Sequence, residues 1–394
     1  MKKITILLFA LFTFYNVANA QWTAVNTGLQ TPTTDEFECF ASIGTNLFVG
    51  TSAGVYVTTD NGANWSPVST GLTNTDIEAM AVIGTTLFAG TSHGIFKSTN
   101  NGALWTRTKT GLDTSLGTSV YALFASGSNL FAGTEAGVFL STGSYTSWSA
   151  VNTGLMQVDF YSFAQLGSSI FSSGLGVYRT TNNGVSWAEV TAGLPTMYNS
   201  DFESFAVLGS DIYAGDLGLG VFKSSDGGTN WTAVNTGLTD LHTQALAANG
   251  TSLFAGGLNG GVFFSNNNAA SWMAVNTGLT DLEVLSFNVF GSYIFAGTRN
   301  GVFRAPLSAF AGITEHQSMN FHLNIYPNPG HGNYQIICEG SKIKTIEVYN
   351  DYGSCVLQQD NHSNEIDITA LPTGMYFVRV SGEGWSVEKK IIKE

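Results

Sequence analysis

The segment LFAGTSHGIFKSTNNGALWTRTKTGL, residues 87–112, is the unit from which most of this chain is built. Two runs of β-branched and aromatic residues, Leu87–Gly90 and Gly94–Lys97, flank a short turn, which is typical of a β-hairpin. A polar loop then ends in Trp105, and a third short run closes on Thr-Gly-Leu. Related units begin at Leu47–Gly50, Leu87–Gly90, Leu130–Gly133, Ile170–Ser173, Ile212–Gly215, Leu253–Gly256 and Ile294–Gly297.

Tryptophans recur through these units at intervals of about 42 residues, and a fixed period of this size is typical of propellers and solenoids. They are Trp22, Trp65, Trp105, Trp148, Trp187, Trp231 and Trp272. A fourth strand precedes each hairpin and carries a large apolar residue at one aligned position: Phe40, Met80, Leu123, Phe163, Phe205, Leu246 and Phe287. Four strands per unit, seven units and no helical periodicity predict an all-β fold, a seven-bladed β-propeller.

The two ends of the repeat array predict how the propeller closes. Gln21–Leu29 holds a Trp strand with no hairpin before it, and Ile294–Ala305 is a hairpin with no Trp strand after it. We therefore expect the N-terminal strand to complete the last blade. The predicted propeller spans residues 21–304.

The first twenty residues have the features of a secretory signal. Lys2 and Lys3 precede an apolar run, Ile4–Tyr15, and Ala18-Asn19-Ala20 resembles a cleavage site before Gln21. A membrane anchor is the alternative, but the apolar run is too short to span a bilayer. We expect a signal peptide over residues 1–20 and no transmembrane anchor.

Composition excludes some partners and leaves others open. Charged residues are 11% of the chain and the net charge is −13, which argues against nucleic acid as a partner. Cations, neutral glycans and basic protein surfaces all remain compatible. Three cysteines are too few for a disulfide framework. Cys338 and Cys355 either pair or remain solitary.

The polar loop before each Trp resembles the Asp-box, or bacterial neuraminidase repeat, Ser/Thr-x-Asp-x-Gly-x-x-Trp. Thr58–Trp65 and Ser224–Trp231 match it fully, whereas Ser98–Trp105 and Thr180–Trp187 carry Asn for Asp. We expect a structural role, with Asp or Asn bonding backbone N–H groups, Gly supplying the turn dihedral and Trp filling space. The residues concerned are Asp60, Gly62, Trp65, Asn100, Gly102, Trp105, Asn182, Gly184, Trp187, Asp226, Gly228 and Trp231.

This resemblance implies a propeller of the sialidase/sortilin-like group. A sialidase of that group needs three clustered arginines, but the predicted propeller has four Arg in all, with Arg179 and Arg304 in a recurring position shared with lysines. Arg107 follows a box Trp, which leaves Arg299 alone in a turn of the opposite face. Sialidase activity is therefore not expected.

The C-terminal part of the chain departs from the repeat. Residues 305–319 are irregular and predict a linker, and residues 320–394 contain short alternating runs that predict a small β-sandwich. Tyr326-Pro327-Asn328-Pro329 and the later LPTGMY at residues 371–376 resemble the C-terminal sorting domain of Bacteroidetes type IX secretion cargo. That resemblance implies the type IX secretion machinery as a partner, passage through the periplasm, and a secreted or surface-attached protein. A carbohydrate-binding or adhesion sandwich is the alternative.

Candidate binding residues follow from strand parity. The hairpin turns and the connections into each inner strand share one face, opposite the Asp-box loops, so inner-strand entrances surround a channel mouth. Two aligned positions there are rich in acids: first Glu36, Asp76, Ser119, Asp159, Asp201, His242 and Glu283, then Glu38, Glu78, Tyr121, Tyr161, Glu203, Gln244 and Leu285. Expected rim residues are His93, Glu135, Asp216 and Arg299, with Met197 and Tyr198 from a longer loop.

Several carboxylates around one opening suit hard cations, an acid–base pair or a basic partner, and also suit plain solubility. No His/Cys cluster or calcium loop is evident, and neither a metal nor a cofactor is expected. We predict a monomeric binding propeller that recognises a glycan, peptide or protein at its acidic mouth. The alternatives are a glycoside hydrolase using paired carboxylates (Glu36/Glu38, Asp76/Glu78 or Asp201/Glu203) and a scaffold without a ligand.

Overall fold

The computed structural model describes residues 21–29, 36–108, 110–112, 119–157, 159–195, 201–310, 323–338, 343–350, 354–360, 365–382 and 385–394. The expected signal peptide, most of the expected linker, Met197 and Tyr198 lie outside these ranges. The chain divides into two compact units, Met1–Ile313 and Thr314–Glu394. Over the described ranges, no helix is long and apolar enough to cross a membrane.

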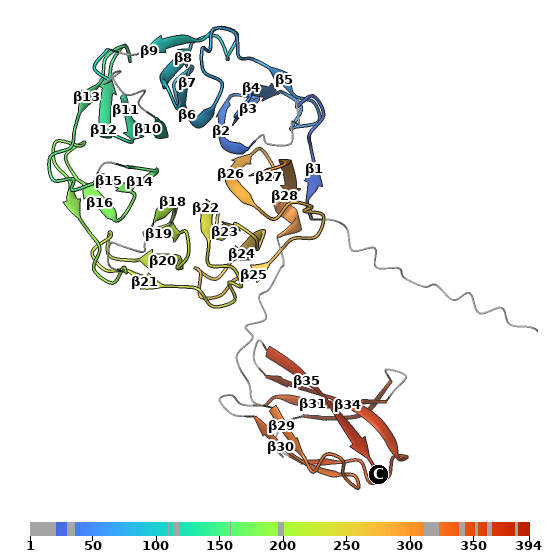
Figure 1. The fold of residues 1–394 in the computed structure, drawn as a ribbon. Coiled ribbons are helices and arrows are strands. Elements are labelled where there is room, and N and C mark those ends of the chain that lie inside the picture. The colour runs from blue at the N-terminus through green and yellow to red at the C-terminus, as the bar shows by residue number, and fades with distance from the viewer. Residues whose placement is uncertain are drawn as a thin grey trace, which may run out of the picture. The chain divides into compact units, whose positions relative to one another are not determined.

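The first unit is a β-propeller, as predicted. Its described residues form seven antiparallel four-stranded sheets arranged around one axis, each with the strand that precedes its hairpin innermost (Figure 1). Blade 1 consists of β2 (Phe37–Ile43), β3 (Asn46–Thr51), β4 (Gly54–Thr58) and β5 (Ser66–Pro67). Blade 2 is β6 (Ile77–Ile83), β7 (Thr86–Thr91), β8 (Gly94–Ser98) and β9 (Thr106–Thr108). Blade 3 is β10 (Val120–Ser126), β11 (Asn129–Thr134), β12 (Gly137–Thr142) and β13 (Ser149–Ala150).

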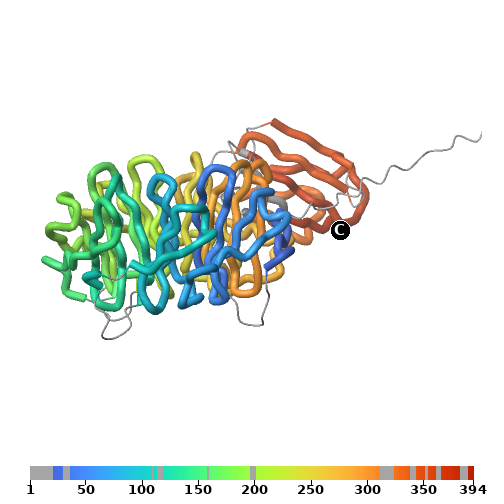
Figure 2. The backbone as a smooth tube through the Cα atoms, turned by 90° about the horizontal axis from the view of Figure 1, so that it is seen from above, coloured from blue at the N-terminus to red at the C-terminus, as the bar shows by residue number. Residues whose placement is uncertain are grey.

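The remaining blades follow the same order. Blade 4 is β14 (Ser162–Leu166), β15 (Ser169–Ser173), β16 (Val177–Thr180) and β17 (Ala188–Glu189). Blade 5 is β18 (Phe202–Leu208), β19 (Asp211–Asp216), β20 (Gly220–Ser224) and β21 (Thr232–Ala233). Blade 6 is β22 (Thr243–Asn249), β23 (Ser252–Gly257), β24 (Val262–Ser265) and β25 (Met273–Ala274). Seen edge-on, the strands run back and forth between the two faces of the ring (Figure 2).

Blade 7 combines the two ends of the propeller. Its sheet order is β1-β28-β27-β26, from β1 (Thr23–Ala24), β28 (Gly301–Pro306), β27 (Tyr293–Thr298) and β26 (Val284–Phe290). Thr23 pairs with Arg304 and Ala24 with Phe303. The predicted closure by the N-terminal strand is therefore confirmed. The 3-10 helix η1 (Leu307–Ala309) follows β28, and Phe310 after it is buried.

The core of the propeller lies between neighbouring blades. One cluster joins Phe48 and Val55 of blade 1 to Leu87, Phe96 and Trp105 of blade 2. One face of each blade is covered by the next blade and the other face by the preceding blade, so the middle strands are apolar throughout and do not alternate. This packing explains runs such as LFV in β3, whose members are fully buried.

The loops that resemble Asp-boxes are held by their own polar side chains. Asp60 accepts hydrogen bonds from Thr58 Oγ1 (2.7 Å) and from the backbone N–H of Asn64 (2.9 Å). Asn100 accepts the equivalent N–H of Leu104 at 2.9 Å. Hydrogen bonds from the Asn64 side chain and backbone lower the pKa of Asp60 to about 2. The contacts made by these side chains are local, and they stabilise the turn.

The glycine of the Thr-Gly-Leu turn before Trp272 has no room for a side chain, and this yields a stability prediction. Gly237 has φ +87°, and a Cβ there would lie 2.1 Å from the carbonyl oxygen of Trp272. A backbone atom cannot swing aside, so Gly237→Ala is expected to lower the free energy of unfolding by about 2 kcal/mol or more. Urea unfolding will measure this. Gly218→Ala is the control, since its Cβ would meet open space, and equal losses in both variants would contradict the explanation.

The second unit consists of two sheets around one core. β29 (Leu323–Tyr326), β30 (Asn333–Cys338) and β33 (Glu365–Asp367) form one sheet. β32 (Cys355–Asp360), β31 (Thr345–Asn350), β34 (Gly374–Gly382) and β35 (Trp385–Lys393) form the other. Tyr334 and Ile366 from the first pack with Val348 and Val378 from the second, as a small sandwich requires. Cys355 is exposed and carries a free thiol.

Candidate functional site

The residues predicted to surround the channel mouth occupy a distinctive backbone position. In blade 1, Phe37 pairs with Thr51 and Cys39 with Gly50, so Glu38 is an extra residue in the inner strand. The same register shift occurs at Glu78, Tyr121, Glu203, Gln244 and Leu285. Bulges of this kind re-aim a side chain out of the regular alternation. Tyr161 lies just before β14 and donates its backbone N–H to Ser173 at 2.9 Å.

One cavity of about 470 Å³ gathers these side chains. All seven residues at this aligned position line it, together with Glu36, Glu283 and Arg299. Gln244 and Leu285 share the aligned position of the glutamates and belong to the lining, although neither is charged or aromatic. The alignment that placed them beside the glutamates already contained the signal.

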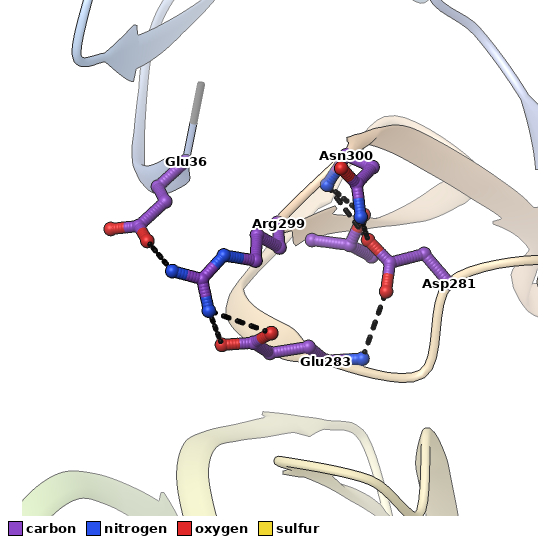
Figure 3. A network of polar contacts seen from close by, with 6 residues as sticks. Glu36, Asp281, Glu283, Arg299 and Asn300 are labelled. Carbon is purple, nitrogen blue, oxygen red and sulfur yellow. Dashed lines mark hydrogen bonds and ion pairs between the residues drawn. The ribbon is translucent and has the colours of Figure 1, made fainter. Parts of the chain in front are cut away.

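Arg299 joins the two blades at the closure of the propeller. Its Nη2 lies 2.8 Å from Glu36 Oε1, and its Nη1 lies 2.9 and 3.1 Å from the two carboxylate oxygens of Glu283 (Figure 3). The turn that presents Arg299 is fixed by Asp281, which accepts the backbone N–H of Asn300 at 2.7 Å. Sequence reasoning missed Asp281. Glu36 and Glu283 thereby share one cation that the chain itself supplies.

Three glutamates of the mouth have strongly raised pKa values. Burial, a hydrogen bond to Glu36 and the charges of neighbouring acids raise the pKa of Glu38 to about 8. Burial and the charge of Asp76 raise the pKa of Glu78 to about 7. Burial and the charge of Asp201 raise the pKa of Glu203 to about 8. Near neutral pH these three carboxyls therefore hold a large share of their protons.

Two tyrosines complete the ring between these acids. The Tyr121 and Tyr161 rings have centroids 5.2 Å apart and are tilted by 49°. Burial is the main cause that raises the pKa of both phenols, so both stay protonated at neutral pH. Next to Glu203 in ring order, Gln244 has a side-chain Oε1 that is shielded from solvent and has no hydrogen-bond partner among the described residues.

The other predicted binding residues that the structure describes lie outside the cavity lining. Asp216 is buried and accepts the backbone N–H groups of Leu219 and Asp201, both at 2.9 Å, so it holds a turn. His242 contacts Asp240 at 3.0 Å. His93 contacts Asn74 in a rim turn. Asp76, Asp159 and Asp201 act on the mouth through their charge.

Within the ranges that the structure describes, no group of three His, Cys, Asp or Glu side chains is placed to hold a metal ion. The lining combines carboxyls, two phenols and a neutral amide, which suit polar or cationic organic groups.

Comparison with known families identifies the C-terminal part of the chain. Residues 324–394 match the family described as "Secretion system C-terminal sorting domain". This confirms the predicted sorting domain, which points to a secreted or cell-surface protein and to interaction with the secretion machinery. No curated protein sequence matches the chain.

Solved structures that resemble the chain are β-propellers. "YCF48 bound to D1 peptide" has a TM-score of 0.58 and 17% identity, covering 73% of this chain and 97% of that one. The extracellular domain of BT4673 from B. thetaiotaomicron has a TM-score of 0.61 and 14% identity, over 93% of this chain and 53% of that one. PorZ of Porphyromonas gingivalis, described as a bacterial surface component of the type-IX secretion system, has a TM-score of 0.53 and 13% identity, over 91% and 59%.

These structures, at identities this low, support the fold alone. The chain spans about half the length of the BT4673 domain that it matches.

Proposed function

We propose that this protein is exported by type IX secretion and that its propeller binds a positively charged segment of a peptide or protein at the mouth. The observation that carries this proposal is an imbalance of charge inside one cavity. Among the described lining residues Arg299 is the sole cation, and Glu36 and Glu283 already hold it. Glu38, Glu78 and Glu203 have acids as their charged neighbours and no compensating cation. A cationic ligand group would supply what these carboxyls lack.

The surface around the mouth favours a peptide or protein over a small cation. Met156, Leu175, Leu241 and Leu282 are exposed large apolar side chains, with Met156 at 75% exposure. All four lie in turns or connections on the mouth face, by the strand order of their blades. Apolar side chains grouped around a polar pocket are common at sites that bind protein segments. The similar propeller YCF48, solved bound to D1 peptide, supports the same class of ligand.

Export is the second half of the proposal. The sorting domain at residues 324–394 supports it, and so does the expected signal peptide over residues 1–20. We propose the domain order signal peptide, propeller from residue 21 to 304, linker 305–319 and sorting sandwich 320–394. The box-like loops support assignment of the propeller to the Asp-box group, whose members share a fold and differ in function.

A glycoside hydrolase is the alternative, and one contact counts against part of it. Arg299 already holds Glu36 in an ion pair at 2.8 Å, so Glu36 is not free to act as the second carboxylate of a Glu36/Glu38 pair. The Asp76/Glu78 and Asp201/Glu203 pairs remain candidates, which a polysaccharide hydrolysis screen tests directly.

The binding proposal predicts a large effect of neutralising the mouth. The protein is screened against peptide and glycan arrays, and the best ligand is titrated by calorimetry. Replacing Glu38, Glu78 and Glu203 together with Gln is expected to lower the affinity for a cationic peptide by about 100-fold or more, because charge-assisted hydrogen bonds are lost. Glu189→Gln, in an outer strand, is the control and is expected to bind normally. Selection of neutral glycans, or full binding by the triple variant, would refute the proposal.

A further inference from the structure

We infer that Tyr121, Tyr161, Glu78 and Glu203 form a receptor for the ammonium group of a lysine side chain presented by the bound peptide. The inference rests on the proposed function and names the chemical group that the mouth selects. It follows from the order of residues around the ring, in which the two tyrosines are neighbours and one glutamate stands on each side of them.

The four residues occupy consecutive blades. Glu78 belongs to blade 2, Tyr121 to blade 3, Tyr161 to blade 4 and Glu203 to blade 5, and all four line one cavity. Because they share one aligned position, the two phenol rings are neighbours, 5.2 Å apart, with one carboxyl on each side. Aromatic faces attract organic cations and also contact an alkyl stem, whereas carboxylates supply the countercharge.

Gln244 lies next to Glu203 in ring order, and it is evidence independent of the acids. Its Oε1 is shielded from solvent without a hydrogen-bond partner among the described residues, although Gln244 lines the same cavity. A buried acceptor left unpaired costs about 1–3 kcal/mol, so a turn of this side chain that brings Oε1 to a ligand donor in the cavity gains free energy. A lysine ammonium has three N–H donors, enough for one flanking carboxyl and the turned Gln244 amide.

The opposite side of the mouth shows what a guanidinium site looks like here. Arg299 reaches both oxygens of Glu283 and one of Glu36, the planar geometry that arginine favours. That site is occupied by the chain itself. The tyrosine side has single carboxyls on either flank of two rings, which suits a compact charge on a flexible apolar stem.

Proton release should accompany binding. The charged groups that act on Glu78 are Asp76 and Glu135, and those that act on Glu203 are Asp201 and Asp216, all acids. In the empty cavity they favour the protonated forms, and an entering ammonium favours the ionised forms. Affinity is therefore expected to rise between pH 6 and pH 9, with protons released at pH 7.

The test uses the full chain and three acetylated, amidated pentapeptides, Gly-Gly-X-Gly-Gly, in which X is Lys, Arg or norleucine. Calorimetry in two buffers of different ionisation enthalpy gives affinity and proton release. We expect the Lys peptide to bind with proton release, the Arg peptide at least about 10-fold more weakly, and the norleucine peptide not at all. Equal binding of Lys and Arg would overturn the inference. Tighter binding of a trimethyllysine peptide than of the Lys peptide would overturn the inference as well, because the trimethylammonium group has no N–H donor.

Two paired variants separate this inference from the proposed function. Tyr121→Phe/Tyr161→Phe keeps the ring faces and is expected to bind the Lys peptide normally, whereas Tyr121→Leu/Tyr161→Leu is expected to lose at least about 10-fold. Thermal unfolding confirms that both variants are folded. If the array peptides of the proposed function bind the Leu variant normally, the lysine receptor is wrong and the cationic mouth stands. If no cationic peptide binds the unmodified protein, both are wrong.

Discussion

Replacing Trp22 with alanine is expected to lower the free energy of unfolding by about 3–5 kcal/mol, the range for removing a large buried aromatic side chain. Trp22 is 1% exposed, and its Nε1 donates a hydrogen bond to Val275 O at 2.7 Å. Its ring packs against Phe310 at 6.1 Å. The loss combines a cavity with an unpaired carbonyl. Urea unfolding followed by tryptophan fluorescence and circular dichroism will measure it.

The same substitution tests the closure of the ring, beyond ordinary core packing. Trp22 directly precedes β1, which covers the edge of β28. We therefore expect faster hydrogen exchange at β28 and loss of the Arg299 bridge between blades 7 and 1. Trp148→Ala is the matched control, since Trp148 is equally buried but lies within an uninterrupted blade. Exchange at β28 that rises equally in both variants would show that Trp22 has no special part in closure.

A second control isolates the side chain from the strand. The side chain of Thr23 in β1 is exposed, and its backbone pairs with Arg304. Thr23→Ala keeps that pairing and is expected to change stability by no more than about 0.5 kcal/mol. If Thr23→Ala lowers the free energy of unfolding as much as Trp22→Ala does, the destabilisation comes from disturbing strand β1 and not from losing the Trp22 side chain.

The architecture was predictable because its determinants are local and repeated. The period of the Trp residues gave the number of blades, and the orphan strand at Gln21–Leu29 gave the closure. The aligned position of Glu38 and its counterparts was also readable from the sequence, since each lies a fixed distance before a turn glycine. The structure places all seven of those residues around one cavity.

Contacts between side chains were less predictable because they depend on bulges and rotamers. The bulge at Glu38 leaves no mark in the residue pattern, yet it aims the carboxyl into the mouth. The sequence analysis left Arg299 without a partner, because Glu36 is far away in sequence and meets Arg299 only at the closure of the ring. Asp216 was predicted to be a rim acid, but its carboxylate accepts hydrogen bonds from the backbone N–H groups of Asp201 and Leu219.

The mouth acids also predict how stability depends on pH. The pKa values of Glu38 and Glu203 are about 8, and that of Glu78 is about 7, against 4.5 in the unfolded chain. The folded state therefore binds more protons than the unfolded state between pH 4.5 and pH 8. Stability from these groups is fully present below pH 4.5 and is lost as the pH rises through 7 and 8. Because all three carboxyls remain partly exposed to solvent, the total loss is on the order of a few kcal/mol.

Urea unfolding from pH 5 to pH 8 measures this loss, and replacing Glu38, Glu78 and Glu203 with Gln should remove it. Gln is neutral at every pH, so the triple variant is expected to lose most of the slope and to exceed the unmodified protein at pH 8 by a few kcal/mol. Burial raises the pKa of Asp216 to about 6, so Asp216 keeps a smaller slope between pH 5 and pH 6. Glu189→Gln is expected to keep the original slope. The lowered pKa of Asp60 affects a separate window, below its unfolded value of 3.8. If the unmodified protein is as stable at pH 8 as at pH 5, the mouth carboxyls are not held protonated, and the cavity is wetter than its burial implies.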